Sequence, residues 1–249
     1  LLGEVPEIKN FFVCTGLNSI GIGSGGGVGK VTAEWLMNGH INEDIFNYDI
    51  KRFQKFHSGL NFIKNRITET LGDLYGMHWP FKQHKTSRNI MTTPYHEELK
   101  KAGACFGVSG GYERAMWFAL DKNKPEYNYS YNFQNWYPSA EFETKNTKKN
   151  IGLFDLTPFS KFELKGENAH QELQKLCTAN IKNEIGKCTY TQMLNPDGGI
   201  ETDLTVVCLD KNYFRIISSA ATRERDKFYL KKYLPKNLTL SDVTDDYCV

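Results

Sequence analysis

A glycine-rich segment near the N-terminus is the first place where residue types and spacing could support chemistry. Residues 21–30 read Gly-Ile-Gly-Ser-Gly-Gly-Gly-Val-Gly-Lys. A phosphate-binding P-loop needs a glycine five positions before its Gly-Lys pair and a serine or threonine directly after the lysine. Those two positions hold Ser24 and Val31, so the P-loop interpretation fails.

Two other interpretations of this segment stay open. The dinucleotide pattern G-x-G-x-x-G matches at Gly21, Gly23 and Gly26, but it lies well past the strand expected at 11–14 and no βαβ unit continues after it. Alternatively, the segment is a loop whose N–H groups approach a ligand and lead into a helix N-terminus. The helix dipole there favours an electron-rich group, such as the pyrimidine edge of a flavin. The glycines could equally do no more than permit close packing of a helix.

An acidic strand is the second candidate site. Residues 189–194 and 200–209 should form a hairpin around the Asn-Pro-Asp-Gly-Gly turn at 195–199. Strand alternation separates one face with Glu201, Asp203 and Thr205 from another with Ile200, Leu204 and Val206. A carboxylate in mid-strand could accept hydrogen bonds from an N–H-rich ring, and a solvent-facing strand carboxylate without a ligand is the alternative.

The other polar residues carry no assigned chemistry. His78 precedes Trp79-Pro80 in an aromatic loop, where a structural role is expected, and Glu113-Arg114 is expected to be an ion pair or a packing anchor. The histidines lack metal-ligand spacing, and the six cysteines form no C-x-x-C pair. We therefore assign no catalytic residue and no metal ligand from these patterns.

The composition excludes some classes of function. The 249 residues are 40% hydrophobic and 24% charged, with a net charge of +2, which is typical of an ordinary globular protein. We expect no nucleic-acid partner, because long Lys/Arg blocks are missing. We expect no membrane insertion, because no apolar run approaches the ~18 residues needed to span a bilayer. The scattered cysteines favour a reducing compartment, and the chain reads like a piece of a longer protein.

The elements that must position these residues follow from periodicity. A strand is expected at 11–14, a helix at 28–37 ending at Gly39, and a helical segment at 50–75. Residues 76–96 should be irregular, 121–137 an exposed loop, and the segment from Pro138 to Lys149 a helix. A strand at 159–164, a helix at 168–177, a strand at 213–217 and a helix from Thr222 to Leu234 complete an α+β pattern.

The order of these motifs resembles a known family. Residues 11–21, Phe-Phe-Val-Cys-Thr-Gly-Leu-Asn-Ser-Ile-Gly, followed by Gly-Gly-Gly-Val-Gly-Lys at 25–30, resemble the last flavin-contacting strand, loop and helix of the D-amino-acid-oxidase-like fold. The likeness is to the branch with dimethylglycine dehydrogenase, sarcosine dehydrogenase and the pyruvate dehydrogenase phosphatase regulatory subunit. It continues through the motifs at 49–53, 78–81, 111–114 and 159–162.

The hairpin carries a second resemblance. Residues 193–206 and 219–226 are similar to the aminomethyltransferase of glycine cleavage, in which the acid before leucine faces the folate. Together the two resemblances imply an α+β fold class with three parts. These are the C-terminal end of a flavin-binding oxidoreductase domain at 1–40, a central linking domain at 41–95, and the N-terminal part of a folate-binding aminomethyltransferase-like domain at 96–249.

The resemblance also implies a set of ligands. FAD would contact Gly16, Asn18, Ser19, Gly21, Gly25, Gly26 and Gly27. Asp203 would contact tetrahydrofolate. The implied full-length enzyme oxidises an N-methylated glycine, dimethylglycine or sarcosine, and passes the one-carbon unit to tetrahydrofolate.

The resemblance also implies a partner protein and a location in the cell. An electron-transfer flavoprotein is the expected partner, and the mitochondrial matrix is the expected location in a eukaryote, with the cytoplasm expected otherwise. One alternative is a non-catalytic regulator like the phosphatase regulatory subunit. A bare folate-binding or scaffold module is another.

Overall fold

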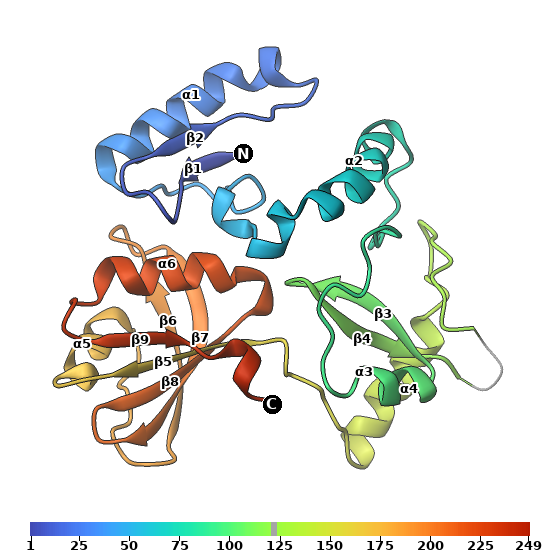
Figure 1. Cartoon of the computed structure of the whole chain (residues 1–249). Helices are drawn as coiled ribbons and strands as arrows, with labels where there is room; N and C mark the ends of the chain where they lie inside the picture. The colour runs from blue at the N-terminus through green and yellow to red at the C-terminus, as the bar shows by residue number, and fades with distance from the viewer. Residues whose placement is uncertain (121–123) are drawn as a thin grey trace. The chain divides into compact units, whose positions relative to one another are not determined.

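The structure is a computed structural model that describes residues 1–120 and 124–249. Residues 121–123, the start of the loop expected at 121–137, lie outside the described residues. The chain divides into two compact units, one made of Leu1–Gln54 with Phe159–Thr244 and the other of Lys55–Pro158 with Asp245–Val249. Figure 1 follows the chain through both units by colour.

The first unit begins with a small antiparallel pair and a long helix. Strand β1 (Leu2–Glu4) pairs with β2 (Phe12–Cys14), and α1 (Gly21–Asn38) follows. Trp35 anchors the helix, because its ring is buried and meets Phe12 edge-on with the ring centroids 5.9 Å apart. Gly39 ends α1 in the left-handed conformation, with φ of 73°, and its N–H donates to the Trp35 carbonyl at 2.8 Å. The predicted helix end is therefore confirmed.

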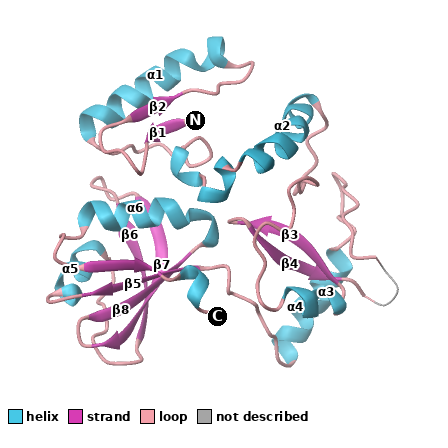
Figure 2. Ribbon diagram, viewed as in Figure 1, coloured by secondary structure: helices cyan, strands magenta, loops and turns pink. Residues whose placement is uncertain are grey.

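A five-stranded antiparallel sheet forms the rest of the first unit, together with two α-helices (Figure 2). Its strands run in the order β6-β7-β8-β5-β9. In chain order the elements are β5 (Ser160–Lys165), α5 (Ala169–Leu176), β6 (Cys188–Leu194), β7 (Ile200–Asp210), β8 (Tyr213–Ser218), α6 (Arg223–Tyr233) and β9 (Thr239–Asp242). Three short 3-10 turns of this unit are η1 (Ile50–Arg52), η3 (Ala220–Thr222) and the start of η4 (Thr244–Asp246).

One face of this sheet is the core of the first unit. Val206 lies opposite Ile216, which in turn lies opposite Phe162, and all three side chains are buried. Leu173 of α5 and Leu230 of α6 pack on the same apolar cluster. Since side chains alternate along a strand, the neighbouring positions of β7 must point to the other face of the sheet.

The second unit contains a hairpin and three α-helices. Its elements are η2 (Lys55–Ser58), α2 (Leu60–Tyr75), α3 (His96–Lys101), β3 (Ala104–Ser109), β4 (Tyr112–Phe118) and α4 (Tyr137–Lys149). The two strands are joined by Gly110 and Gly111, which both have positive φ angles, 57° and 86°. That conformation at both central residues belongs to the tight turn that matches the twist of a hairpin.

Several sequence-based expectations need correction. The helix expected at 28–37 begins at Gly21. The strand at 11–14 was expected to be buried, but β2 is only half-buried in the described chain, because α1 covers one side of it. Ile200 was placed on the same face of β7 as Leu204 and Val206, yet this residue is 70% exposed. It lies at the start of the strand, beside a register shift at Met193/Leu194. The shift interrupts the alternation of inward and outward side chains at this position.

Candidate functional site

The loop between β2 and α1 holds three of the residues predicted to face a flavin. Gly16 and Ser19 have left-handed backbone conformations, with φ angles of 70° and 61°, and Asn18 lies in the turn between them. Glycine adopts this conformation without a Cβ clash, which is the physical reason for Gly16. All three residues are exposed, so their backbone and side chains are accessible to a ligand.

Gly21 opens helix α1. The first ladder bond of the helix runs from the Ser24 N–H to the Ile20 carbonyl at 2.9 Å. The N–H groups of Gly21, Ile22 and Gly23 precede this bond and therefore have no acceptor within the helix. A helix N-terminus with such N–H groups favours an electron-rich group. The structure thus places this feature at Gly21 rather than at Val28.

The placement of Gly25, Gly26 and Gly27 in a loop is wrong, because all three lie inside α1. Beyond Ser24 each helical N–H donates to a carbonyl four residues earlier, so these residues have no backbone donor to offer a ligand. Among the described atoms, an added Cβ at any of the three would meet nothing within 4 Å. Close packing inside the described chain therefore does not explain them, although glycine costs about 1 kcal/mol relative to alanine within a helix.

A pocket of about 310 Å³ opens beside this part of α1. Gly23 and Gly27, which lie one helical turn apart, both line it, and their lack of side chains widens it. The remaining lining is mostly apolar and comes from Leu2, Leu17, Ile20, Ser24, Val28, Val31, Ile45 and Tyr48. The pocket suits a flat apolar group or apolar side chains, and FAD contact at these glycines stays a prediction.

Asp203 lies on β7, on the sheet face opposite the core. Its neighbours along the strand, Thr202 and Leu204, are buried, and Asp203 itself is exposed. The predicted alternation of Asp203 with Leu204 and Val206 is confirmed. The carboxylate is therefore available to accept hydrogen bonds from a ligand, while the strand that carries it is held by the core.

Tyr190 is a site residue that the sequence did not single out. It lies on β6 opposite Thr205, and its hydroxyl donates to Asp203 Oδ2 at 3.1 Å. The Tyr190 ring is 62% exposed on the same face. An antiparallel register places diagonal neighbours within reach of long side chains. The hairpin could have revealed this contact from sequence only if the register of its turn had been known.

Glu201 was predicted to share a sheet face with Asp203, but it lies at the register shift of β7 and its charged neighbours include Arg225 and Asp226 of α6, the helix that packs on the core. Burial raises the pKa of Glu201, and the nearby Arg225 guanidinium opposes that effect. Burial also raises the pKa of Asp226, which accepts a hydrogen bond from the Thr222 hydroxyl at 2.6 Å. Thr222 lies at the start of α6 as predicted, but its side chain bonds Asp226 instead of capping a helix N–H.

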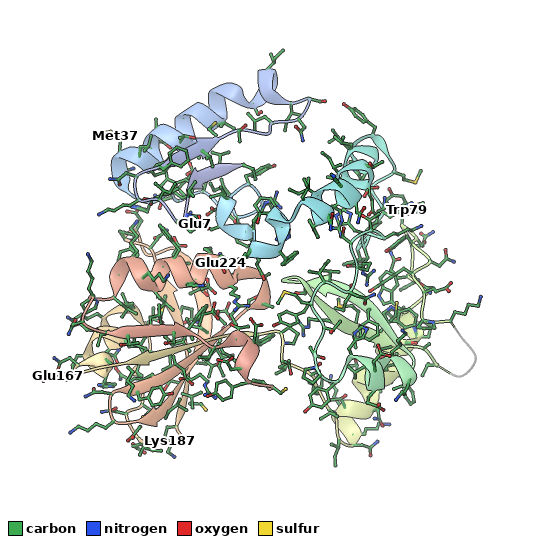
Figure 3. The ribbon with its side chains drawn as sticks, in the orientation of Figure 1. Glu7, Met37, Trp79, Glu167, Lys187 and Glu224 are labelled. Atoms are coloured by element: carbon green, nitrogen blue, oxygen red, sulfur yellow. The ribbon has the colours of Figure 1, made fainter. Side chains whose placement is uncertain are left out.

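The residues expected to be structural have structural contacts in the second unit. Trp79, labelled in Figure 3, lies against Tyr131 with ring centroids 5.0 Å apart. His78 Nε2 is 3.0 Å from the Asp73 carbonyl. Glu113 is buried and binds the Arg88 guanidinium through both carboxylate oxygens, so its ionic partner is Arg88. Glu113 is therefore a packing anchor.

Glu69, Asp73 and His84 are one group of metal-ligand types that the structure brings together, with donor atoms within 4.8 Å of one another. Their carboxylates already have partners. Glu69 accepts the backbone N–H groups of Lys85 and Thr86, and Asp73 binds the Lys82 ammonium. Half-buried among these donors, Glu69 has a pKa lowered to about 2, because hydrogen bonds from Thr86 and Lys85 outweigh desolvation. The cluster fastens the segment after α2 to that helix.

The model of the family described as "GCVT N-terminal domain" matches residues 95–249, more than half of the chain. The chain belongs to this family. The model described as "FAD dependent oxidoreductase central domain" matches residues 38–93.

The chain is similar to an oxidase, a regulatory subunit and a dehydrogenase. The chain is 40% identical over 93% of its length to 4-methylaminobutanoate oxidase (formaldehyde-forming) from Paenarthrobacter nicotinovorans. It is 33% identical over 99% of its length to the mitochondrial pyruvate dehydrogenase phosphatase regulatory subunit of Mus musculus. It is 31% identical over 92% of its length to human mitochondrial sarcosine dehydrogenase. The chain spans only 28–29% of the length of these relatives.

A solved structure shares the fold. The crystal structure of glycine cleavage system aminomethyltransferase T from Bartonella henselae matches 63% of this chain and 39% of its own, with a TM-score of 0.51 and 22% identity. At this identity the likeness concerns fold alone. It agrees with the predicted aminomethyltransferase-like architecture, which is confirmed together with the flavin-oxidoreductase family resemblance.

Proposed function

We propose that the full-length protein oxidatively demethylates an N-methylated amino acid and transfers the released one-carbon unit to tetrahydrofolate. The observation that carries this proposal is the pairing, in one compact unit, of a glycine-rich helix N-terminus at Gly21 with the exposed Asp203–Tyr190 pair on an aminomethyltransferase-family sheet. The relatives named for 4-methylaminobutanoate and sarcosine both act on small N-methylated amino acids. Dimethylglycine, sarcosine and 4-methylaminobutanoate are therefore the substrates to test first.

The first half of the proposal needs a flavin, and the residues present fit one. FAD, when bound, supplies the two-electron oxidation of the N-methyl carbon. The loop at Gly16, Asn18 and Ser19 and the N–H groups at the start of α1 would hold the electron-rich edge of its ring. Gly25, Gly26 and Gly27 would contribute a helix surface without side chains, along which a flat group can approach closely.

The second half needs a group that binds a folate ring. The Asp203 carboxylate would accept hydrogen bonds from ring N–H groups, and charge-assisted bonds of this kind are about twice as strong as neutral ones. The Tyr190 hydroxyl fixes the orientation of that carboxylate. Because β7 is anchored by its buried face, the acid is held in place before a ligand arrives.

The proposal also names an electron acceptor and a location in the cell. The electrons taken from the amine must leave through an acceptor, and an electron-transfer flavoprotein is the proposed partner. The mitochondrial relatives support a mitochondrial matrix location if the organism is a eukaryote. Within the part of the chain that the structure describes, no helix is long and apolar enough to cross a membrane.

The test is spectroscopic. The full-length protein is purified, and its visible spectrum is recorded anaerobically before and after addition of sarcosine, dimethylglycine or 4-methylaminobutanoate. We expect a flavin band that bleaches with at least one of them, and formation of methylenetetrahydrofolate in place of free formaldehyde when tetrahydrofolate is present. A protein without flavin, or a flavin band indifferent to all three amines, would contradict the proposal.

A non-catalytic regulator is the second candidate. The observation that favours it is the 33% identity, over nearly the whole chain, to the pyruvate dehydrogenase phosphatase regulatory subunit. A regulator would change the activity of a phosphatase catalytic subunit without consuming any methylated amine. Measuring both activities with the same preparation separates the two candidates.

A further inference from the structure

A single histidine joins the end of α1 to the turn between β6 and β7. His40 follows the Gly39 cap of the helix, and Met37, labelled in Figure 3, marks this end of α1. The His40 Nε2 atom is 2.5 Å from Asp197 Oδ2, and Nδ1 is 3.0 Å from the Asn38 carbonyl oxygen. Asp197 lies in the tight turn at 195–199, so the contact connects residues 157 positions apart.

The two partners of His40 decide its protonation. A backbone carbonyl can only accept a hydrogen bond, and so can an ionised carboxylate. Both ring nitrogens must therefore carry a proton if both contacts are hydrogen bonds. A neutral imidazole has one N–H group and can satisfy only one of the two acceptors. The geometry is that of an imidazolium cation.

The charges around His40 come from each element packed against it. Asp197 on the hairpin turn is the anion, and it also accepts a hydrogen bond from the Asn42 side chain. Lys232 of α6 is the opposing cation, and its ammonium donates to the Gly39 carbonyl at 2.6 Å. The His40 side chain is 17% exposed and that of Asp197 is 53% exposed. The lysine fastens the same helix end through a contact of its own, and burial lowers its pKa. The histidine is the group whose two contacts both require a charged ring.

We propose that His40 is a pH-sensitive latch, which holds the end of α1 on the β6–β7 turn more tightly while it is charged than after it loses a proton, when its single N–H group serves only one of the two acceptors. The latch joins the helix whose other end carries the glycine-rich N-terminus to the hairpin whose second strand carries Asp203. This inference rests on contacts inside one compact unit and does not depend on the proposed function.

The direction of the pH effect follows from the shifts. The hydrogen bond to Asp197 raises the pKa of His40 above its ordinary value of 6.5, against desolvation and the Lys232 charge. Stabilisation by the latch is therefore complete below about pH 6.5 and is lost as pH rises through the pKa of His40 in the folded protein. The same hydrogen bond lowers the pKa of Asp197 from 3.8, so protonation of the carboxylate opens the latch only at still lower pH.

The test is an NMR titration of the histidine side chains in the 249-residue chain, with signals assigned by a His40→Gln variant. We expect the titration midpoint of His40 to lie above 6.5 and to move down in Asp197→Asn. Amide exchange at Gly39 and Gly198, corrected for the intrinsic effect of pH, should accelerate as pH passes the His40 midpoint. In His40→Gln this acceleration should disappear.

A matched control is Asp210→Asn, which removes an exposed carboxylate near the far end of β7 and should leave the His40 midpoint unchanged. A His40 midpoint at or below 6.5, or one that Asp197→Asn does not move, would overturn the latch. So would equal pH dependence of amide exchange in the parent chain and in His40→Gln.

Discussion

Helix α1 and strand β7 both carry residues predicted to face a cofactor, but they are stabilised in different ways. β7 buries Leu204, Val206 and Cys208 in the core and leaves Asp203 on its open face. α1 buries only Trp35 among its residues, and an added Cβ at any of its glycines after Gly21 would meet nothing within 4 Å in the described chain. The strand is supported by its own sheet, whereas the first half of the helix gains little from the chain around it.

Because α1 and β7 are stabilised differently, mutation would abolish their two sites in different ways. A residue on the open face of β7 can change without disturbing the core, because alternate positions hold the strand in place. The glycines of α1 lower the intrinsic stability of the helix. Their benefit must come from a group that lies against them, such as the flavin in the proposed function. The experiments below test this contrast between α1 and β7.

Truncation of the sheet core should have the largest effect. Phe214 is fully buried between β5 and β7, and Phe214→Ala should lower the free energy of unfolding by about 3–5 kcal/mol. Ile22→Ala on the outer side of α1, where the side chain is fully exposed, should change it by less than about 0.5 kcal/mol. Urea unfolding followed by circular dichroism measures both. Equal losses in the two variants would remove the contrast between helix and sheet.

The ion pairs of the sheet should make the free energy of unfolding fall at acid pH. Asp242 of β9 binds the Arg223 guanidinium through both oxygens. Hydrogen bonds from Arg223 and Thr244 outweigh burial and lower its pKa from 3.8 to about 2. A lowered carboxyl pKa gives stability that is present above pH 3.8 and lost as pH falls towards 2. About 2 kcal/mol of unfolding free energy should disappear over that range.

Unfolding free energies measured between pH 5 and 2 test this prediction. Asp242→Asn should be less stable at pH 5 and should show a flatter dependence on pH at the acid end. The same slope in the variant and the parent chain would mean that Asp242 does not contribute to the acid sensitivity.

Substitutions on the open face of β7 should lower ligand affinity without changing the fold. In the full-length protein, Asp203→Ala should weaken tetrahydrofolate binding roughly tenfold or more, since a hydrogen bond to a charged group contributes about 1.5–3 kcal/mol. Tyr190→Phe should weaken binding less, because it leaves the carboxylate in place. Isothermal titration calorimetry measures both affinities, and Asp210→Ala serves as the matched control. Unchanged affinity in Asp203→Ala, with the fold intact, would count against the folate site.

A substitution on the glycine face of α1 should change stability only slightly and with the opposite sign. Gly26→Ala adds a methyl group that meets nothing within 4 Å in the described chain. The 249-residue chain should gain about 0.5–1 kcal/mol of unfolding free energy. In the full-length protein the same substitution should reduce the flavin content after purification. A variant that retains all its flavin would show that no cofactor lies against this face.

Local signals in the sequence predicted the β6–β7 hairpin and the end of α1 correctly. The Asn-Pro-Asp-Gly-Gly turn and the Gly39 cap act through bonds between close neighbours, so short windows contain the information. Strands β1, β3, β4 and β9 were not predicted. β9 is four residues long and pairs with β5, which lies more than seventy residues earlier, so its signal is not local.

The start of α1 shows the limit of propensity. Six glycines at positions 21 to 29 argue against a helix, yet the helix begins at Gly21. Helix formation is cooperative, and the second half of α1, anchored by Trp35, extends the helix backwards through the glycines. Each glycine taken singly favours a loop, so the sequence pattern predicted a helix start that is too late.

The sequence by itself determined the family, the alternation that turns Asp203 away from the core, and the cap that ends α1, because each depends on residue order or on neighbours in the chain. The tertiary structure alone decided the partners of these residues: Tyr190 for Asp203, Arg88 for Glu113, and Asp197 for His40. Those contacts depend on strand register and on the packing of distant segments. Neither is encoded in the spacing of residues along a single stretch of chain.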